Sequence, residues 1–137
     1  MSEYLEKAKE LRAIETPHYN CAQSVLIPFA EKAGLDGETA YRLAACFGGG
    51  MKRGSVCGAV TGGLMALGLL GLDDPAITAE FHRIFRERHG GMLDCSKLLA
   101  ASAAAGEPKK QHCDGLVFES VRLVEELLEK HSKAGRD

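Results

Sequence analysis

Apolar residues recur at intervals of three or four positions along most of the chain, and this periodicity predicts helices. The clearest stripe lies near the C-terminus and consists of Leu116, Val117, Val121, Val124, Leu127 and Leu128. A second stripe consists of Ile77, Phe81, Ile84 and Phe85. No segment shows the sustained alternation of apolar and polar residues that is typical of a half-buried strand. The pattern therefore predicts an all-α fold.

Capping residues, prolines and glycines divide this pattern into segments. The predicted helices span residues 2–13, 20–33, 36–46, 55–71, 75–90, 94–105 and 113–131. Three glycines at 48–50 predict a flexible loop, because glycine loses the most conformational freedom in any regular element. We expect a compact bundle of about five to seven helices around a glycine-rich apolar central helix. Residues 1–131 are expected to form a single all-helical domain, followed by a polar tail at 132–137.

The composition argues against several classes of partner. The chain has 137 residues, a net charge of −2 and no Trp, so we expect no nucleic-acid-binding surface. Residues 54–72 carry no charge, but six glycines interrupt them and leave about fifteen helical residues, too few for a membrane span. The N-terminal segment is charged and lacks the apolar core of a secretory signal. Together with the odd number of cysteines, these features predict a cytoplasmic protein.

Four of the five cysteines lie where a helix is predicted to begin, each close to an Asn, Ser or Asp. They are Cys21, Cys57, Cys95 and Cys113. The positive end of the helix dipole favours a thiolate over a thiol at such positions. Because the thiolate is both the nucleophile and the metal ligand, this placement indicates sulfur chemistry. Cys46 instead lies at the C-terminal end of a predicted helix, and we expect it in the core.

The strongest local motif surrounds Cys57. Gly54, Gly58 and Gly62 recur every four residues, so they are expected to line one helix face that another group can approach closely. We take Gly58 and Gly62 as candidate cofactor-binding positions. Lys52 and Arg53 lie just upstream, and their charges are expected to lower the pKa of the Cys57 thiol. Tight helix packing around a buried cysteine explains the same motif equally well.

The spacing of the cysteines excludes several known sites. There is no Cys-x-x-Cys pair, so neither a thioredoxin-type motif nor a zinc ribbon is present. Any site shared by the four cysteines must be assembled by the fold from four different helices. His82 and His89 lie among arginines and indicate a solvated basic face. His112 adjoins Cys113 and could accept its proton, but adjacency in sequence is weak support for that role.

The order of these motifs resembles the C_GCAxxG_C_C family of redox-active proteins. The resemblance is carried by Tyr19-Asn20-Cys21-Ala22, Phe47-Gly48-Gly49-Gly50-Met51, Cys57-Gly58-Ala59-Val60-Thr61-Gly62, Cys95 and Cys113. It places the four family cysteines on Cys21, Cys57, Cys95 and Cys113, and gives Cys46 no role. It implies a small helical redox protein, and the occurrence of related domains in split-Soret-type cytochromes favours an iron–sulfur centre. Covalent c-type haem is not expected, because Cys-x-x-Cys-His is absent.

Three hypotheses follow. In the first, two of the four cysteines cycle between dithiol and disulfide, with Cys57 as the attacking thiol. In the second, Cys21, Cys57, Cys95 and Cys113 bind an iron–sulfur cluster or zinc. In the third, the chain is a non-enzymatic helical interaction module whose cysteines only fill the core. The sequence does not decide whether the protein is an enzyme and does not identify its redox partner, although the apolar central helix makes a homodimer plausible.

Overall fold

The computed structural model describes residues 2–132, and within this range the chain forms seven α-helices and one short π-helical turn, η1. The elements are α1 (Glu3–Ala13), α2 (Cys21–Ala30), α3 (Gly37–Leu43), η1 (Gly50–Gly54), α4 (Gly58–Leu69), α5 (Pro75–Arg88), α6 (Cys95–Ala104) and α7 (Lys109–Ser132). No β-strand is present in this part of the chain, only an isolated bridge between Val56 and Asp94. The predicted all-α fold is confirmed. The predicted polar tail begins at the last residue of α7, and 133–137 lie outside the described residues.

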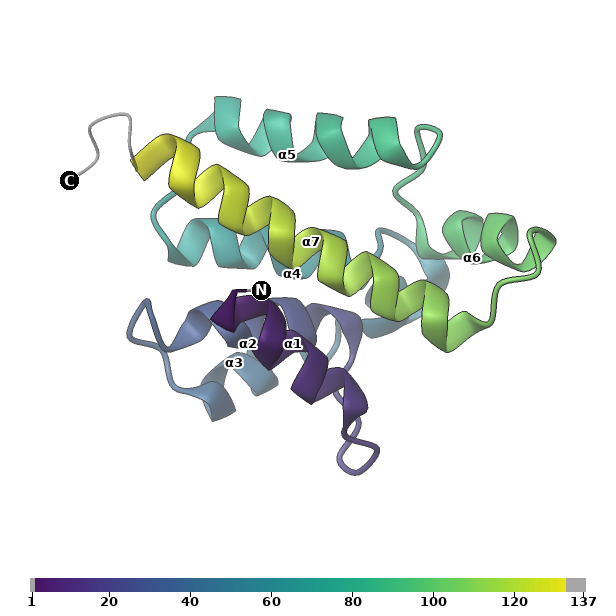
Figure 1. Ribbon diagram of the computed structural model, residues 1–137, viewed down its shortest axis with the longest axis horizontal. Coiled ribbons are helices and arrows are strands. Elements are labelled where there is room, and N and C mark those ends of the chain that lie inside the picture. The colour runs from purple at the N-terminus through teal and green to yellow at the C-terminus, as the bar shows by residue number, and fades with distance from the viewer. Residues whose placement is uncertain (1, 133–137) are drawn as a thin grey trace.

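Helix α4 forms the centre of the bundle. It packs against both α2 and α7, which also contact each other. Figure 1 shows α7 crossing in front of α4, with α5 on one side of it, α1, α2 and α3 on the other, and α6 beside its N-terminal end. The predicted apolar stripes of α5 and α7 face this core: all of their residues are buried except Ile84 and Leu128, which are partly buried. Hydrophobic burial on both faces of α4 therefore holds the bundle together.

The glycines of α4 serve helix packing. A Cβ atom on Gly62 would lie 2.6 Å from the carbonyl oxygen of Ala22 and 2.9 Å from its Cα, so only glycine allows α2 to approach this closely. Gly54 does not continue this face, because it lies in η1 with a φ of +71°. Most of α4 is buried within the chain, and a homodimer stays a prediction.

Several helix boundaries differ from the prediction. Helix α4 begins at Gly58 and not near Ser55, because the chain from Gly49 to Lys52 turns in the left-handed region. Helix α7 begins at Lys109, four positions before Cys113. The carbonyl of Pro108 accepts the His112 N–H at 3.0 Å, so this proline precedes the first turn of α7, where its missing N–H costs nothing. Cys113 therefore lies inside the helix, one turn from its start.

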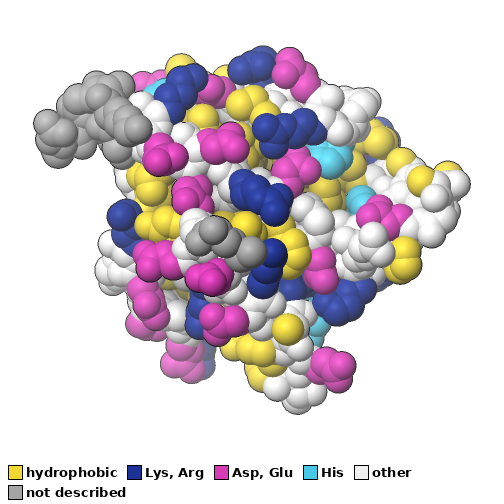
Figure 2. Space-filling model, viewed as in Figure 1, with side chains coloured by type: hydrophobic (Ala, Val, Ile, Leu, Met, Phe, Trp, Pro, Cys, Tyr) yellow, Lys and Arg dark blue, Asp and Glu magenta, His cyan; other side chains and the backbone are white. Residues whose placement is uncertain are grey.

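Among residues 2–132, no helix is long and apolar enough to cross a membrane. On the face shown in Figure 2, acidic and basic side chains alternate with apolar ones over α1, α5 and α7, without a broad region of one charge.

Candidate functional site

The fold brings the four family cysteines together on one cavity of about 460 Å³. Cys21 and Cys95 are the first residues of α2 and α6, Cys57 is the residue before α4, and Cys113 lies in α7. Twelve other residues complete the lining, namely Arg12, Ile14, Glu15, His18, Gly49, Gly58, Leu98, Leu99, Lys109, Lys110, His112 and Leu116. Four segments far apart in the sequence thus supply the sulfurs, as the hypothesis of a shared site required.

Backbone pairing places Cys57 next to Cys95. The bridge between Val56 and Asp94 joins the two loops, with the Cys57 N–H donating to Leu93 O at 2.8 Å and the Cys95 N–H donating to Ser55 O at 2.6 Å. These bonds fix the start of α4 against the start of α6. Both cysteines therefore reach the cavity from the same side of the bundle.

Two glycines allow this close assembly. A Cβ on Gly50, which has a φ of +65°, would lie 2.8 Å from Cys95 Cβ and also clash with the Ser55 backbone. A Cβ on Gly58 would lie 3.1 Å from Cys21 Cβ. Gly58 lines the cavity, whereas Gly62 packs on Ala22 and does not. The expected cofactor-binding role is therefore not supported by the position of Gly62.

Cys113 and Cys21 form an electrostatically coupled pair. The hydrogen bond from the Cys21 side chain is the largest cause that lowers the pKa of Cys113, and the charges of Arg12 and Lys109 lower it further, to about 7, against the effect of burial. The pKa of Cys21 is raised well above its usual value by the same hydrogen bond and by burial. Cys113 is therefore the more acidic thiol of the pair, whereas Cys21 stays protonated at neutral pH.

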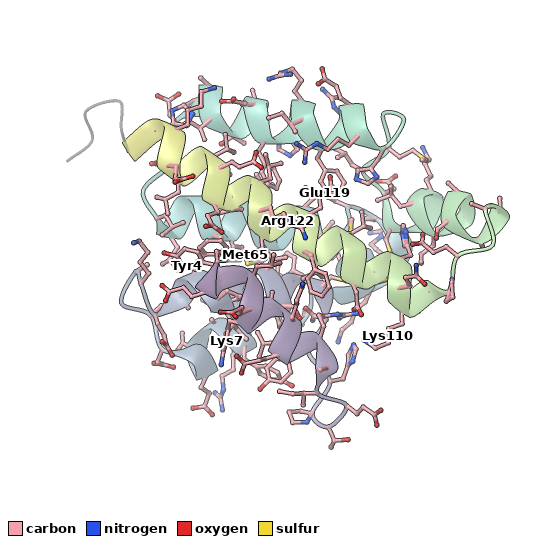
Figure 3. The ribbon with its side chains drawn as sticks, in the orientation of Figure 1. Tyr4, Lys7, Met65, Lys110, Glu119 and Arg122 are labelled. Atoms are coloured by element: carbon pink, nitrogen blue, oxygen red, sulfur yellow. The ribbon has the colours of Figure 1, made fainter. Side chains whose placement is uncertain are left out.

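Arg12 supplies positive charge to this pair from α1. Its side chain is only 7% exposed, with Nε 2.7 Å from Asp114 Oδ1 and Nη1 donating to Tyr19 O at 2.8 Å. Lys110 Nζ donates to Asp114 Oδ2 and to Arg12 O, both at 3.0 Å. Figure 3 shows Lys110 on the first turn of α7, next to the end of α1. This network holds the end of α1 against α7 and keeps the guanidinium beside the sulfurs.

Lys109 is the second cation near the sulfurs. It lies one helical turn before Cys113, and its charge lowers the pKa of both Cys113 and Cys95. Neither Arg12 nor Lys109 was among the site residues expected from the sequence. Arg12 was detectable because it lies four positions after Ala8 on the buried face of its helix. Lys109 was not, because the predicted helix began too late.

The expected acidic thiol at Cys57 is wrong. Burial is the largest influence on this residue and raises its pKa to about 11, although hydrogen bonds from the backbone of Ala59 and Val60 act in the opposite direction. Lys52 and Arg53 are exposed and line a neighbouring hollow of the surface, not the cavity. The helix start does provide donors, as predicted, but the loss of water around a side chain that is 4% exposed outweighs them.

Cys95 and Cys46 also differ from the prediction. Burial also raises the pKa of Cys95, so this thiol is neutral at pH 7. Cys46 was expected in the core, but it is exposed in the turn that follows α3. The reason is that α3 ends at Leu43, three residues before the predicted end, so Cys46 is not on a helix face that packs inward.

The predicted solvated basic face is present in its arginines, but His89 does not belong to it. Arg83, Arg86 and Arg88 are exposed, as a solvated basic face requires, but His89 Nε2 lies 3.0 Å from both carboxylate oxygens of Glu119 on α7. Figure 3 shows Glu119 between α7 and α5. The interpretation of His89 as solvated is therefore wrong, because it joins two helices.

His112 lines the cavity but does not contact Cys113 through a hydrogen bond among the described residues. Its Nδ1 lies 3.5 Å from Glu107 Oε1, and its buried Nε2 has no partner in the described part of the chain. The structure therefore gives no direct support to proton transfer from Cys113 to His112.

The four sulfurs share a cavity without forming a closed set of metal ligands. Within residues 2–132, no three His, Cys, Asp or Glu side chains are grouped so that they could hold a metal ion. Binding of zinc or an iron–sulfur cluster by Cys21, Cys57, Cys95 and Cys113 stays a prediction.

Comparison with known proteins gives one match. A family model described as "Putative redox-active protein (C_GCAxxG_C_C)" matches residues 19–127, which include all four cysteines of the cavity. A search of the curated proteins and a search of the solved structures each found no match.

Proposed function

The chain belongs to the C_GCAxxG_C_C family, and we propose that it performs thiol–disulfide exchange, with Cys113 as the attacking thiolate and Cys21 as the resolving thiol. The observation that carries this proposal is that Cys21 and Cys113 line one cavity, where the hydrogen bond from Cys21 and the charges of Arg12 and Lys109 lower the pKa of Cys113 to about 7. A nucleophilic cysteine needs a lowered pKa, and a partner thiol close enough to donate a hydrogen bond to it is also close enough to attack it.

The exchange proceeds in two steps. The Cys113 thiolate attacks one sulfur of a substrate disulfide, so that a bond from Cys113 to that sulfur forms, the substrate S–S bond breaks, and the first substrate thiolate leaves and takes up a proton. Cys21 then loses its proton and attacks the Cys113 sulfur, which forms the Cys21–Cys113 disulfide and releases the second substrate thiol. Two protein thiols are oxidised and one disulfide is reduced to two thiols. A dithiol reductant then reduces the Cys21–Cys113 disulfide to two thiols and completes the cycle.

Cys57 and Cys95 do not compete with this pair as nucleophiles. Burial raises the pKa of both residues, so both thiols are protonated at neutral pH. A neutral thiol is a poor nucleophile. Of the four cysteines that line the cavity, only Cys113 has a lowered pKa.

A four-thiolate metal or iron–sulfur centre is the second candidate function, because all four sulfurs face the same cavity. Such a site would require the sulfurs to move closer together than the described residues place them. Its thiolates would use the same cations, Arg12 and Lys109, that act on Cys113. The metal content of protein purified without oxygen and without a metal-binding tag distinguishes the two candidates.

The proposal is tested by mapping disulfides. Reduced protein is oxidised with one equivalent of a disulfide reagent, the remaining thiols are alkylated, and peptides are identified by mass spectrometry. We expect a Cys21–Cys113 disulfide and free Cys46. Stoichiometric iron or zinc in the untreated protein would instead favour the metal centre. Unchanged redox behaviour after replacement of Cys113 by Ser would contradict exchange at this pair and leave a structural role for the cysteines.

A further inference from the structure

The position of the reactive sulfurs limits what can reach them. Cys57 is buried, and Cys21, Cys95 and Cys113 are partly buried around a cavity that is partly open to solvent. A volume of about 460 Å³ lies within the range of small-molecule sites. A cavity of this size, with its sulfurs set below the surface, suits a small organic disulfide better than a disulfide held within a folded protein.

The walls of the cavity indicate the character of that molecule. Ile14, Leu98, Leu99 and Leu116 give it apolar surface suited to a carbon chain. His112 adds a polar group to the wall formed by α7, and its buried Nε2 has no partner among the described residues. A ligand with both apolar and polar parts matches this lining.

The charges around the cavity favour an anion. Arg12, Lys109 and Lys110 line it, against one carboxylate, Glu15. Arg12 and Lys110 are both paired with Asp114, whereas Lys109 has no ion pair within the described part of the chain. Lys109 is exposed and acts on both Cys95 and Cys113, so its charge lies near the reacting sulfur and open to solvent. It is therefore the cation available to a ligand.

Building on the proposed exchange, we infer that the cavity receives small organic disulfides that carry a carboxylate, and that Lys109 binds this carboxylate while the substrate disulfide lies against Cys113. The apolar wall holds the carbon chain between the two groups. Attack by Cys113 then releases a carboxylate-bearing thiol, and attack by Cys21 releases the second one, so that one disulfide and two protein thiols become two small thiols and the Cys21–Cys113 disulfide.

Three disulfides of similar size test this inference: dithiodipropionate with two carboxylates, hydroxyethyl disulfide without charge, and cystamine with two ammonium groups. The rate constant of each with reduced protein is divided by its rate constant with free dithiothreitol, which removes intrinsic reactivity. Cys46→Ser protein is used throughout, so that the exposed thiol does not contribute. We expect dithiodipropionate to be favoured about fivefold over the neutral disulfide, the size of one partly screened charge pair.

Two variants distinguish binding by Lys109 from a general effect of positive charge on the protein. Lys109→Gln should abolish the preference for the anion, whereas Lys97→Gln, which removes an exposed charge from α6 outside the cavity lining, should keep it. Equal normalised rates for the three disulfides, a preference that survives Lys109→Gln, or faster reduction of the protein disulfides of insulin would each overturn the inference.

The same assay distinguishes this inference from the proposed function. If Cys113→Ser reacts with none of the three disulfides while the parent protein shows no charge preference, the exchange pair stands and only the carboxylate site is wrong. If Cys113→Ser reacts as fast as its parent, the exchange pair itself is wrong and the inference fails with it.

Discussion

Arg12 of α1 and Asp114 of α7 are 102 positions apart in the sequence, yet their side chains form an ion pair with 2.7 Å between Nε and Oδ1. The arginine is almost completely buried, and the carboxylate is 22% exposed. Asp114 also accepts a bond from Lys110. The pair thus fixes the first helix to the last one at the place where the guanidinium charge reaches the Cys21–Cys113 pair.

Replacing Arg12 with Ala should destabilise the protein by about 3 kcal/mol, because it leaves a partly buried carboxylate with only Lys110 as a partner. Arg83→Ala removes an exposed ion pair with Glu87 and should cost less than about 1 kcal/mol. Urea unfolding of both variants measures the difference. Equal losses would show that the Arg12–Asp114 pair contributes no more than a surface pair.

Two glycines of α4 provide a matched pair of substitutions. Gly62→Ala places a Cβ against the Ala22 backbone and should destabilise the protein by about 2–3 kcal/mol. Gly68→Ala meets open space on the same helix and should stabilise it by about 0.5–1 kcal/mol, since Ala is the better helix former. Thermal unfolding of the two variants should therefore shift in opposite directions. A neutral Gly62→Ala would show that α2 and α4 are not in close contact.

The raised pKa of Cys57 predicts a change of stability in alkaline solution. The unfolded thiol ionises near its ordinary value of 9.0, whereas burial keeps the folded thiol protonated to about 11. The stabilising contribution of the neutral thiol is therefore complete below pH 9 and is lost by pH 11, a change of about 3 kcal/mol. The stability difference between the natural protein and Cys57→Ala, measured by urea unfolding across this range, should shrink by that amount. A constant difference would mean that Cys57 is accessible to water.

The helices could be predicted from the sequence because their signals are local. Asn20 caps α2 through a reciprocal bond with Gln23, and Asp36 and Asp74 cap α3 and α5, as their residue types indicate. The left-handed turn at Gly49–Lys52 could not be predicted, because residues such as Met51 and Lys52 rarely adopt positive φ. The close approach of Gly50 to Cys95 and Ser55 within this turn depends on the fold.

The candidate site was only partly predictable. The choice of four cysteines followed from helix starts and from the family resemblance, but their order of acidity did not. Proximity to a helix start lowers a pKa and burial raises it, and only the fold decides which effect is larger. Burial dominates at Cys57, whereas the hydrogen bond from Cys21 dominates at Cys113. Sequence spacing carries no information about that contact, since Cys21 and Cys113 belong to opposite ends of the chain.

The pH dependence of alkylation measures whether Cys113 is the attacking thiolate and whether Cys21 activates it. Cys46→Ser protein is treated with iodoacetamide across pH 5–10, and modification of Cys113 is followed by mass spectrometry. We expect a rate that is half-maximal at about pH 7 and a midpoint that moves upward when Cys21→Ala removes the hydrogen bond. A midpoint near 9 in the parent protein, or one that Cys21→Ala leaves unchanged, would contradict this expectation.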